Sequence, residues 1–137
     1  MNDTPPRVAL RTGLMLLAVS LPLGLTLEAL HAMKVQVYLG SAMRRELWRL
    51  AHAHGNLLGI LCLVLAALGP RLVPDPGKRL RFERLLAVGS VAMPLGFLLG
   101  GVLNSEGDPS LGILLVPAGG VLVFVALVLA MRSAASA

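Results

Sequence analysis

Apolar residues run in four long stretches along this chain, and polar residues are concentrated in the shorter segments between them. The stretches cover approximately residues 13–30, 47–68, 85–103 and 111–131. Each is long enough to cross about 30 Å of hydrocarbon as an α-helix, because a helix rises about 1.5 Å per residue. The pattern therefore predicts an all-α integral membrane four-helix bundle, built as a single transmembrane domain.

Composition agrees with a membrane protein. Of the 137 residues, 56% are hydrophobic and only 14% are charged. A soluble domain of this size has too little interior volume to bury so much apolar surface. The net charge of +5 is therefore read as a topology signal, and nucleic acid is not an expected partner. Membrane lipid is.

The basic residues are distributed unequally between the two ends of the predicted bundle. Eight lie in residues 7–11, 71–84 and 132, and four lie in residues 34–49. Under the positive-inside rule, this predicts a multi-pass protein of the inner (cytoplasmic) membrane with both termini in the cytoplasm. All three histidines, His31, His52 and His54, then lie toward the external side.

The N-terminal region allows a second interpretation. Arg7 and Arg11 before an apolar run are also typical of a secretory signal peptide, whose removal would leave three spans. The preceding residues 1–6 are polar and contain prolines, so they are predicted to be disordered.

The second apolar stretch carries polar residues where a membrane helix usually has aliphatic ones. On a helix, His52, Gly55, Asn56 and Gly59 share one face, and Cys62 continues it. His54 lies about 200° around from His52, at about 100° per residue. Ionisable side chains at membrane depth are costly and usually functional. An imidazole beside small residues leaves room for a large flat ligand, for which haem is the first candidate.

Small residues also have a packing interpretation. Ala51, Gly55 and Gly59 recur every four residues, and Gly96 and Gly100 repeat the pattern on the third helix. Such seams allow close helix approach. Packing explains the third helix well, but it does not explain why a histidine lies on the seam of the second. The lone cysteine is interpreted as a small packing residue.

The end of the first helix offers weaker candidates. Glu28 and His31 are three residues apart and share a face, as in the Glu-x-x-His unit of di-iron bundles. A full di-iron site needs a second such motif, which this chain lacks. Glu28 is alternatively expected to pair with Lys34 or Arg49 near the membrane surface, or to orient a ligand histidine through a hydrogen bond.

A family resemblance centres on the second helix. The pattern Glu-x-Trp-x-x-Ala-His from Glu46 to His52, with a glycine seven residues later and a closing Pro-Arg-Leu, resembles the styrene oxide isomerase and hydroxylaminobenzene mutase family. A second patch, from Gly89 through Phe97 to Asn104, is similar in spacing to that family's third helix. The resemblance covers roughly residues 46–131.

The resemblance implies a homotrimer that holds haem b between subunits through the histidine corresponding to His52. In that family the iron acts as a Lewis acid on a small hydrophobic epoxide without net redox change. Three positions depart from the family pattern, because Leu58, Leu98 and Pro94 are apolar where the family has polar groups. The resemblance therefore implies a retained haem ligand, with weak or absent epoxide isomerisation.

Three hypotheses remain at this point. The first is a haem protein with a single axial histidine, or with a second imidazole from His31 or a neighbouring subunit, which would favour electron transfer. The second is a non-haem metal site built from Glu28, His31 and either His52 or His54. The third is a bundle without cofactor, in which the histidines only form hydrogen bonds between helices.

Overall fold

The computed structural model describes residues 7–105 and 107–135, and every long element in these ranges is a helix. The predicted all-α membrane bundle is confirmed, since four helices are long and apolar enough to cross a membrane. The prediction for residues 1–6 concerns a segment outside the described residues. The elements are α1 (Val8–Ala32), α2 (Gln36–Leu39), α3 (Ala42–Leu72), α4 (Pro76–Val102), the 3-10 helix η1 (Leu111–Leu114) and α5 (Leu115–Ala135).

Side-chain caps set the starts of α3 and α4. Ser41 Oγ accepts a hydrogen bond of 3.2 Å from the backbone N–H of Arg44, so α3 begins one residue after this serine. Asp75 Oδ1 accepts one of 2.7 Å from the N–H of Lys78, and Pro76 occupies the first helical position of α4. The helices extend beyond the predicted spans at one or both ends, because helical turns continue past the apolar segment.

The connection between α3 and α4 is much shorter than predicted. The turn-forming composition of residues 69–78 predicts a long break, but α3 continues through Pro70 to Leu72 and α4 starts at Pro76. A proline in the last turn of a helix removes one N–H donor and disturbs only the adjacent turn, so the helix end tolerates it. Only residues 73–75 connect the two helices.

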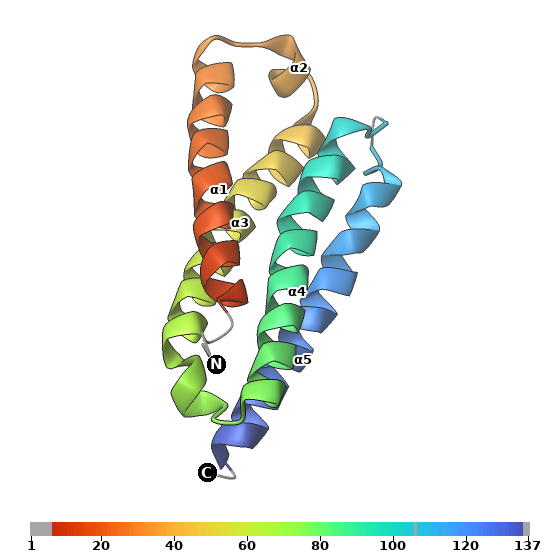
Figure 1. Ribbon diagram of the computed structural model, residues 1–137. Coiled ribbons are helices and arrows are strands. Elements are labelled where there is room, and N and C mark those ends of the chain that lie inside the picture. Colours follow the sequence, from red (N-terminus) through yellow and green to blue (C-terminus); the bar gives the residue numbers. More distant parts are fainter. Residues whose placement is uncertain (1–6, 106, 136–137) are drawn as a thin grey trace.

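The helices pack in the order α1, α3, α4 and α5, and each contacts its neighbours in this series most extensively. In Figure 1, α4 and α5 lie side by side over their length, whereas α1 and α3 approach closely near the lower end and diverge toward the upper end, where α2 joins them. The end of α5 and the α3–α4 connection lie at the lower end, and the start of α1 lies in the lower half of the bundle, above them (Figure 1).

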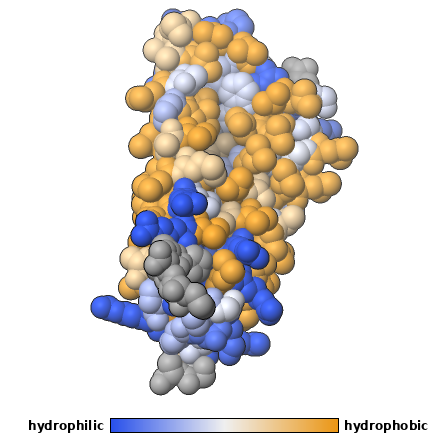
Figure 2. Space-filling view, in the orientation of Figure 1, coloured by the Kyte–Doolittle hydropathy of each residue, from blue (hydrophilic) through white to orange (hydrophobic). Residues whose placement is uncertain are grey.

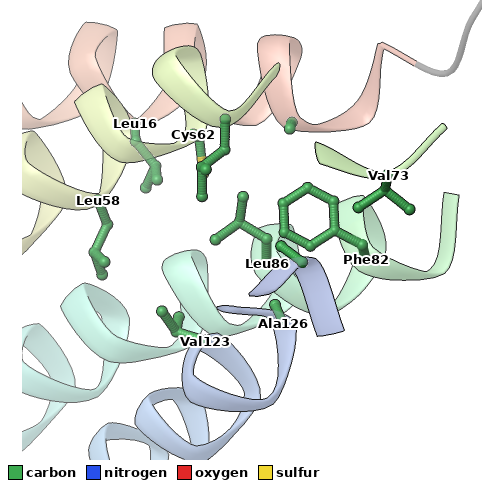
Figure 3. Close-up of a cluster of buried hydrophobic side chains, with 11 residues drawn as sticks. Leu16, Leu58, Cys62, Val73, Phe82, Leu86, Val123 and Ala126 are labelled. Atoms are coloured by element: carbon green, nitrogen blue, oxygen red, sulfur yellow. The ribbon is translucent and has the colours of Figure 1, made fainter. Parts of the chain in front are cut away.

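The core lies between these helices in the lower half of the bundle (Figure 3). Phe82 and Leu86 of α4 and Cys62 of α3 are fully buried there. The Cys62 thiol donates a hydrogen bond of 3.4 Å to Ser90 Oγ, which also is fully buried. The cysteine therefore is a packing residue, as the sequence indicates.

Glycines bring α4 and α5 into backbone contact. A Cβ built on Gly89 would lie 2.6 Å from the carbonyl oxygen of Gly119, and one built on Gly119 would lie 2.8 Å from the carbonyl oxygen of Gly89. Gly96 packs against Leu115 and Val116 in the same way. The packing interpretation of the third-helix glycines is therefore correct.

A buried carboxylate connects α4 to the start of α1. Glu83 is 3% exposed, and its Oε2 accepts a hydrogen bond of 3.1 Å from the backbone N–H of Ala9. The first turn of a helix has unpaired N–H groups and the positive end of the helix dipole, so a carboxylate stabilises it. The two residues are 74 positions apart, and no local sequence signal pairs them.

The outer surface of the bundle is apolar. Large side chains such as Leu25 and Phe124 are 75% and 67% exposed. Figure 2 shows hydrophobic residues over the middle and upper part of one face, with hydrophilic residues gathered toward the lower end. A broad exposed apolar surface on membrane-length helices is a surface for lipid contact.

Candidate functional site

A large cavity lies between α1 and α3 where the two helices diverge, and α2 contributes to its wall. Its volume is about 1020 Å³. It combines apolar walls with polar and charged groups. The residues that line it are Leu21, Gly24, Leu25, Leu27, Glu28, His31, Tyr38, Arg45, Glu46, Arg49, Leu50, His52 and Ala53. Three sequence candidates, Glu28, His31 and His52, are therefore brought to one cavity.

His52 is held in a defined orientation by α1. Its Nδ1 lies 2.7 Å from the backbone carbonyl oxygen of Ser20, which can only accept a hydrogen bond, so Nδ1 carries the hydrogen. Gly24 lies against the same ring, because a Cβ at that position would be 2.8 Å from Nδ1. A neutral imidazole in this tautomer has its lone pair on Nε2. The sequence did not indicate a role for Ser20 or Gly24. The absence of a side chain at Gly24 leaves the space that the His52 ring occupies.

Asn56, one turn further along α3, contacts the same imidazole. Its Nδ2 lies 3.2 Å from His52 Nε2 and 3.3 Å from Nδ1. Its Oδ1 is buried and has no hydrogen-bond partner among the described residues. The predicted association of these two side chains on one helix face is correct.

Gly55 and Gly59, which the sequence groups with His52 on a face with room for a flat ligand, lie against α1 and are not among the residues that line this cavity. A Cβ at position 55 would overlap Ser20 Oγ, and one at position 59 would lie 3.2 Å from the carbonyl oxygen of Gly13. The Ala51/Gly55/Gly59 seam is thus covered within the chain, chiefly by α1. His52 lies beside this seam because its ring continues the same contact between α1 and α3.

His54 points away from the cavity, as its helical angle predicts. Its Nδ1 lies 2.9 Å from the carbonyl oxygen of Leu50 on the preceding turn. Its ring lies against Phe97 of α4, with 4.7 Å between ring centroids. It is therefore separated from the other two histidines.

His31 lies in the same cavity as His52 but at a different level. His52 packs against Gly24, and His31 is seven residues further along α1, or about 10 Å at 1.5 Å per residue. The ring of His31 instead meets the edge of Tyr38, with 6.4 Å between centroids. The two imidazoles are not arranged as a facing pair within one chain.

Tyr38 connects the cavity to the end of the bundle. It is 3% exposed and stacks on Trp48, with ring centroids 6.1 Å apart and an angle of 17° between planes. Trp48 in turn lies 5.9 Å below the guanidinium of Arg44. Trp48 thus has a stacking role that the sequence alone does not indicate.

Arg44 joins three segments at this end. Its Nε donates to the carbonyl oxygen of Gly101 at 2.9 Å, and its two terminal nitrogens donate to the carbonyl oxygen of Val37 at 2.6 Å and to Asn104 Oδ1 at 3.1 Å. The planar guanidinium can make such divergent bonds, whereas a lysine cannot. Arg44 therefore fixes α2 and the α4–η1 connection to the start of α3. The sequence indicates only a base near a helix start.

Glu28 lines the cavity without a recorded hydrogen bond or ion pair to any residue that the structure describes. Among the described residues, the expected pairing of Glu28 with Lys34 or Arg49 is not formed, and Arg49 instead lies 3.9 Å from Glu46. The role of orienting His52, considered for Glu28, belongs to the backbone carbonyl of Ser20.

The non-haem metal hypothesis is not supported by the side-chain arrangement. No group of three or more His, Cys, Asp or Glu residues that could hold a metal ion occurs within residues 7–105 and 107–135. Glu28, His31 and His52 share a large cavity without converging on one point. His54 lies on another side of α3.

The three departures from the family pattern lie away from the His52 cavity. Leu58 is part of the buried core. Pro94 and Leu98 line a second, apolar cavity of about 220 Å³ between α1, α3 and α4, to which Ser20 and Ala51 also contribute. Within one chain, these positions therefore do not face the cavity that His52 lines.

Comparison of this chain with protein-family models, with curated proteins and with solved structures finds no match. The geometry defines a membrane-type helical bundle with a large cavity between α1 and α3, whose mostly apolar walls carry several polar and charged groups. The likeness to the styrene oxide isomerase family stays an expectation from the sequence motif around His52.

Proposed function

We propose that this protein binds b-type haem in the α1–α3 cavity, where His52 would hold the iron through Nε2. The observation that carries the proposal is the hydrogen bond of 2.7 Å between His52 Nδ1 and the carbonyl oxygen of Ser20. Metal-ligating histidines typically donate their other ring N–H to a carbonyl or carboxylate, which fixes the tautomer and ring orientation.

The cavity fits such a ligand in size and in the distribution of polarity. Its volume of about 1020 Å³ is at the upper end of the range for cofactor pockets, which is about 300–1,000 Å³. Leucines from both helices supply apolar walls for a porphyrin. Arg45 and Arg49 lie on the His52 side of α3 toward the outer end, where carboxylate groups of the ligand would find cations.

When bound, haem would supply an iron centre able to take up a ligand or a small hydrophobic substrate. His52 would hold the iron, and Ser20 and Gly24 would keep its ring from turning. Because His31 lies about two helical turns away along α1, a single axial histidine is favoured over two from the same chain.

Redox-neutral isomerisation of an epoxide is the activity that the sequence resemblance implies, and it is expected to be weak or absent. Leu58 and Leu98 are apolar, and they lie in the core and in the second cavity. Neither can donate a hydrogen bond to a substrate oxygen. Loss of one such donor costs about 10²–10³ in rate in other enzymes.

A bundle without cofactor is the alternative that the same contacts favour. His52 already has neighbours within the chain, since Nδ1 lies 2.7 Å from the carbonyl oxygen of Ser20 and Asn56 Nδ2 lies close to both ring nitrogens. In this case His52 only joins α1 to α3 by a hydrogen bond. The haem hypothesis predicts that haem binding depends on His52, whereas the cofactor-free hypothesis predicts no haem binding. One set of variants therefore separates them.

The experiment compares His52→Ala with the matched control His54→Ala in detergent-purified protein. We expect the wild type and His54→Ala to show the Soret band of b-type haem, and His52→Ala to lose it. Retention of full haem by His52→Ala would reject the ligand assignment. A wild-type protein that purifies without a Soret band and does not bind added hemin would favour the cofactor-free bundle.

The inner-membrane location and cytoplasmic termini predicted from charge are part of the proposal, and they place the cavity toward the external face. The homotrimer rests on the resemblance alone. The Ala51/Gly55/Gly59 seam is covered by α1, so association would use other lipid-facing surfaces. Native mass spectrometry counts the subunits directly.

A further inference from the structure

We propose that one end of the bundle binds anionic phospholipids through their phosphate headgroups. This basic end is defined by the lysine and arginine residues within 7–11 and 71–84 and by Arg132, which are eight of the 12 bases of the chain. It comprises the start of α1, the α3–α4 connection with the adjoining helical turns, and the end of α5. The proposal does not depend on haem, because the cavity that His52 lines is toward the other end.

The bases of the basic end have few partners inside the protein. Arg79 donates from one terminal nitrogen to the carbonyl oxygen of Val73 at 3.4 Å. The other bases are exposed, and none of them forms a side-chain hydrogen bond or an ion pair with a residue that the structure describes. The two acids within the same ranges, Asp75 and Glu83, each accept a hydrogen bond from a backbone N–H. The basic end therefore has an excess of positive charge that is free to meet an external anion.

The opposite end of the bundle uses its bases differently. Arg44 donates to three oxygen atoms of the chain, Arg45 donates to a backbone carbonyl, and Arg49 lies 3.9 Å from the carboxylate of Glu46. Of the bases within 34–49, Lys34 alone has no such recorded partner in the described part of the chain. Side-chain bonds within the protein thus hold most bases at that end. The contrast indicates that the basic end is built for a partner outside the chain.

Exposed apolar side chains next to these bases identify the partner as a lipid. Met15 is one helical turn from Arg11 on α1, and Val88 is one turn from Arg84 on α4. Residues four apart share a helix face, so each of these bases adjoins an apolar surface on the side of the membrane interior. An anionic phospholipid has the same order of groups, with a phosphate above its acyl chains. A soluble anion would use the bases alone.

The membrane places the basic end among headgroups. The apolar sides of the four long helices lie in hydrocarbon, and the hydrophilic residues gather toward the lower end of the bundle (Figure 2). Guanidinium groups can bind phosphate oxygens with two parallel hydrogen bonds, and all but one of these bases are arginines. Clusters of bases at the ends of membrane helices attract anionic lipids, and each base strengthens binding about fivefold.

The test is native mass spectrometry of the full chain in a non-ionic detergent, titrated with phosphatidylglycerol or with phosphatidylcholine of the same acyl chains. We expect phosphatidylglycerol to bind about tenfold more tightly, or better. Lys78→Gln/Arg81→Gln should weaken its binding about 25-fold, at about fivefold per base, and leave phosphatidylcholine unaffected. Both side chains are exposed, so the fold tolerates the change.

Two further pairs of substitutions serve as controls. Lys34→Gln/Arg49→Gln makes the same change in net charge at the opposite end, and it should leave phosphatidylglycerol binding at the wild-type level. Lys78→Arg/Arg81→Lys retains both charges of the basic end and should also bind as the wild type does. Inorganic phosphate at the concentration of the lipid should not displace it, because phosphate lacks acyl chains.

The proposal is overturned if the wild type binds both lipids equally, or if Lys78→Gln/Arg81→Gln binds phosphatidylglycerol as tightly as the wild type. Equal weakening by the two neutralising pairs would assign the effect to net charge and not to this surface. Loss of binding in the charge-retaining pair would assign it to a change in fold. Displacement by inorganic phosphate would show a simple anion site in place of a lipid surface.

Discussion

The imidazole of His52 lies directly against Gly24 across the α1–α3 interface. A Cβ at position 24 would be 2.8 Å from Nδ1 and 2.9 Å from Nε2, distances that real Cβ atoms do not adopt. The His52 ring of α3 therefore fits at this level because Gly24 of α1 has no side chain there.

Gly24→Ala is expected to displace His52 and to weaken the α1–α3 contact by about 1–3 kcal/mol, the usual cost of overpacking. Haem occupancy should fall with it. Gly120→Ala is the control, because a Cβ on this α5 glycine would meet only Met93 Sδ, at 4.0 Å. Soret absorbance and unfolding in detergent measure both effects. Equal behaviour of the two variants would show that the close packing at Gly24 is unimportant.

Gly59→Leu is expected to destabilise the single chain and not merely its oligomer. A Cβ there would already lie 3.1 Å from Leu17 and 3.2 Å from the carbonyl oxygen of Gly13, so a leucine has to separate α1 from α3. Unfolding of the protein and its subunit count by native mass spectrometry distinguish the two effects. Loss of association with unchanged chain stability would place the seam between copies instead.

Glu83→Ala is expected to lower stability by about 1–3 kcal/mol, because the buried N–H of Ala9 loses its acceptor. Glu83→Gln retains an acceptor and should lose less, the remainder being the attraction of the charge to the helix dipole, about 0.3–1 kcal/mol. Amide exchange at Ala9 reports the cap directly. Glu46→Ala is the control, since that side chain is 63% exposed and forms only a surface ion pair. Slow exchange at Ala9 in Glu83→Ala would contradict the assignment.

Arg44→Lys is expected to loosen the outer end of the bundle, because one ammonium cannot replace three bonds to Gly101, Val37 and Asn104. Hydrogen exchange should rise in α2 and in the α4–η1 connection, and stay unchanged in the core around Phe82. Arg49→Lys serves as control, because its side chain is 71% exposed. Unchanged exchange at α2 would show that Tyr38 stacking alone holds this helix.

The orientation in the membrane can be tested with single cysteines in a Cys62→Ser background. The charge distribution places the α4–η1 connection outside and the α3–α4 connection inside. A membrane-impermeant maleimide on intact cells should therefore label Ser105→Cys and spare Gly77→Cys, both of which replace exposed residues. The opposite labelling pattern would invert the predicted topology.

The sequence by itself determined that the chain forms four helices of membrane length, together with several local features. In lipid, four apolar segments of membrane length satisfy their backbone hydrogen bonds as helices, because each backbone N–H and C=O then finds its partner within its own segment. The separation of His52 from His54 follows from the helical angle. The start of α3 follows from Ser41, because a cap acts within one turn.

Only the tertiary structure decided which surfaces meet. A small-residue seam such as Gly55/Gly59 specifies close approach by some helix, but it carries no information on whether α1 or another copy fills it. The pairs Gly24–His52 and Glu83–Ala9 join residues far apart in the chain, so their spacing leaves no periodic signal. The cavity exists because α1 and α3 diverge above their contact, a relation set by packing between elements and not by the residues of either one.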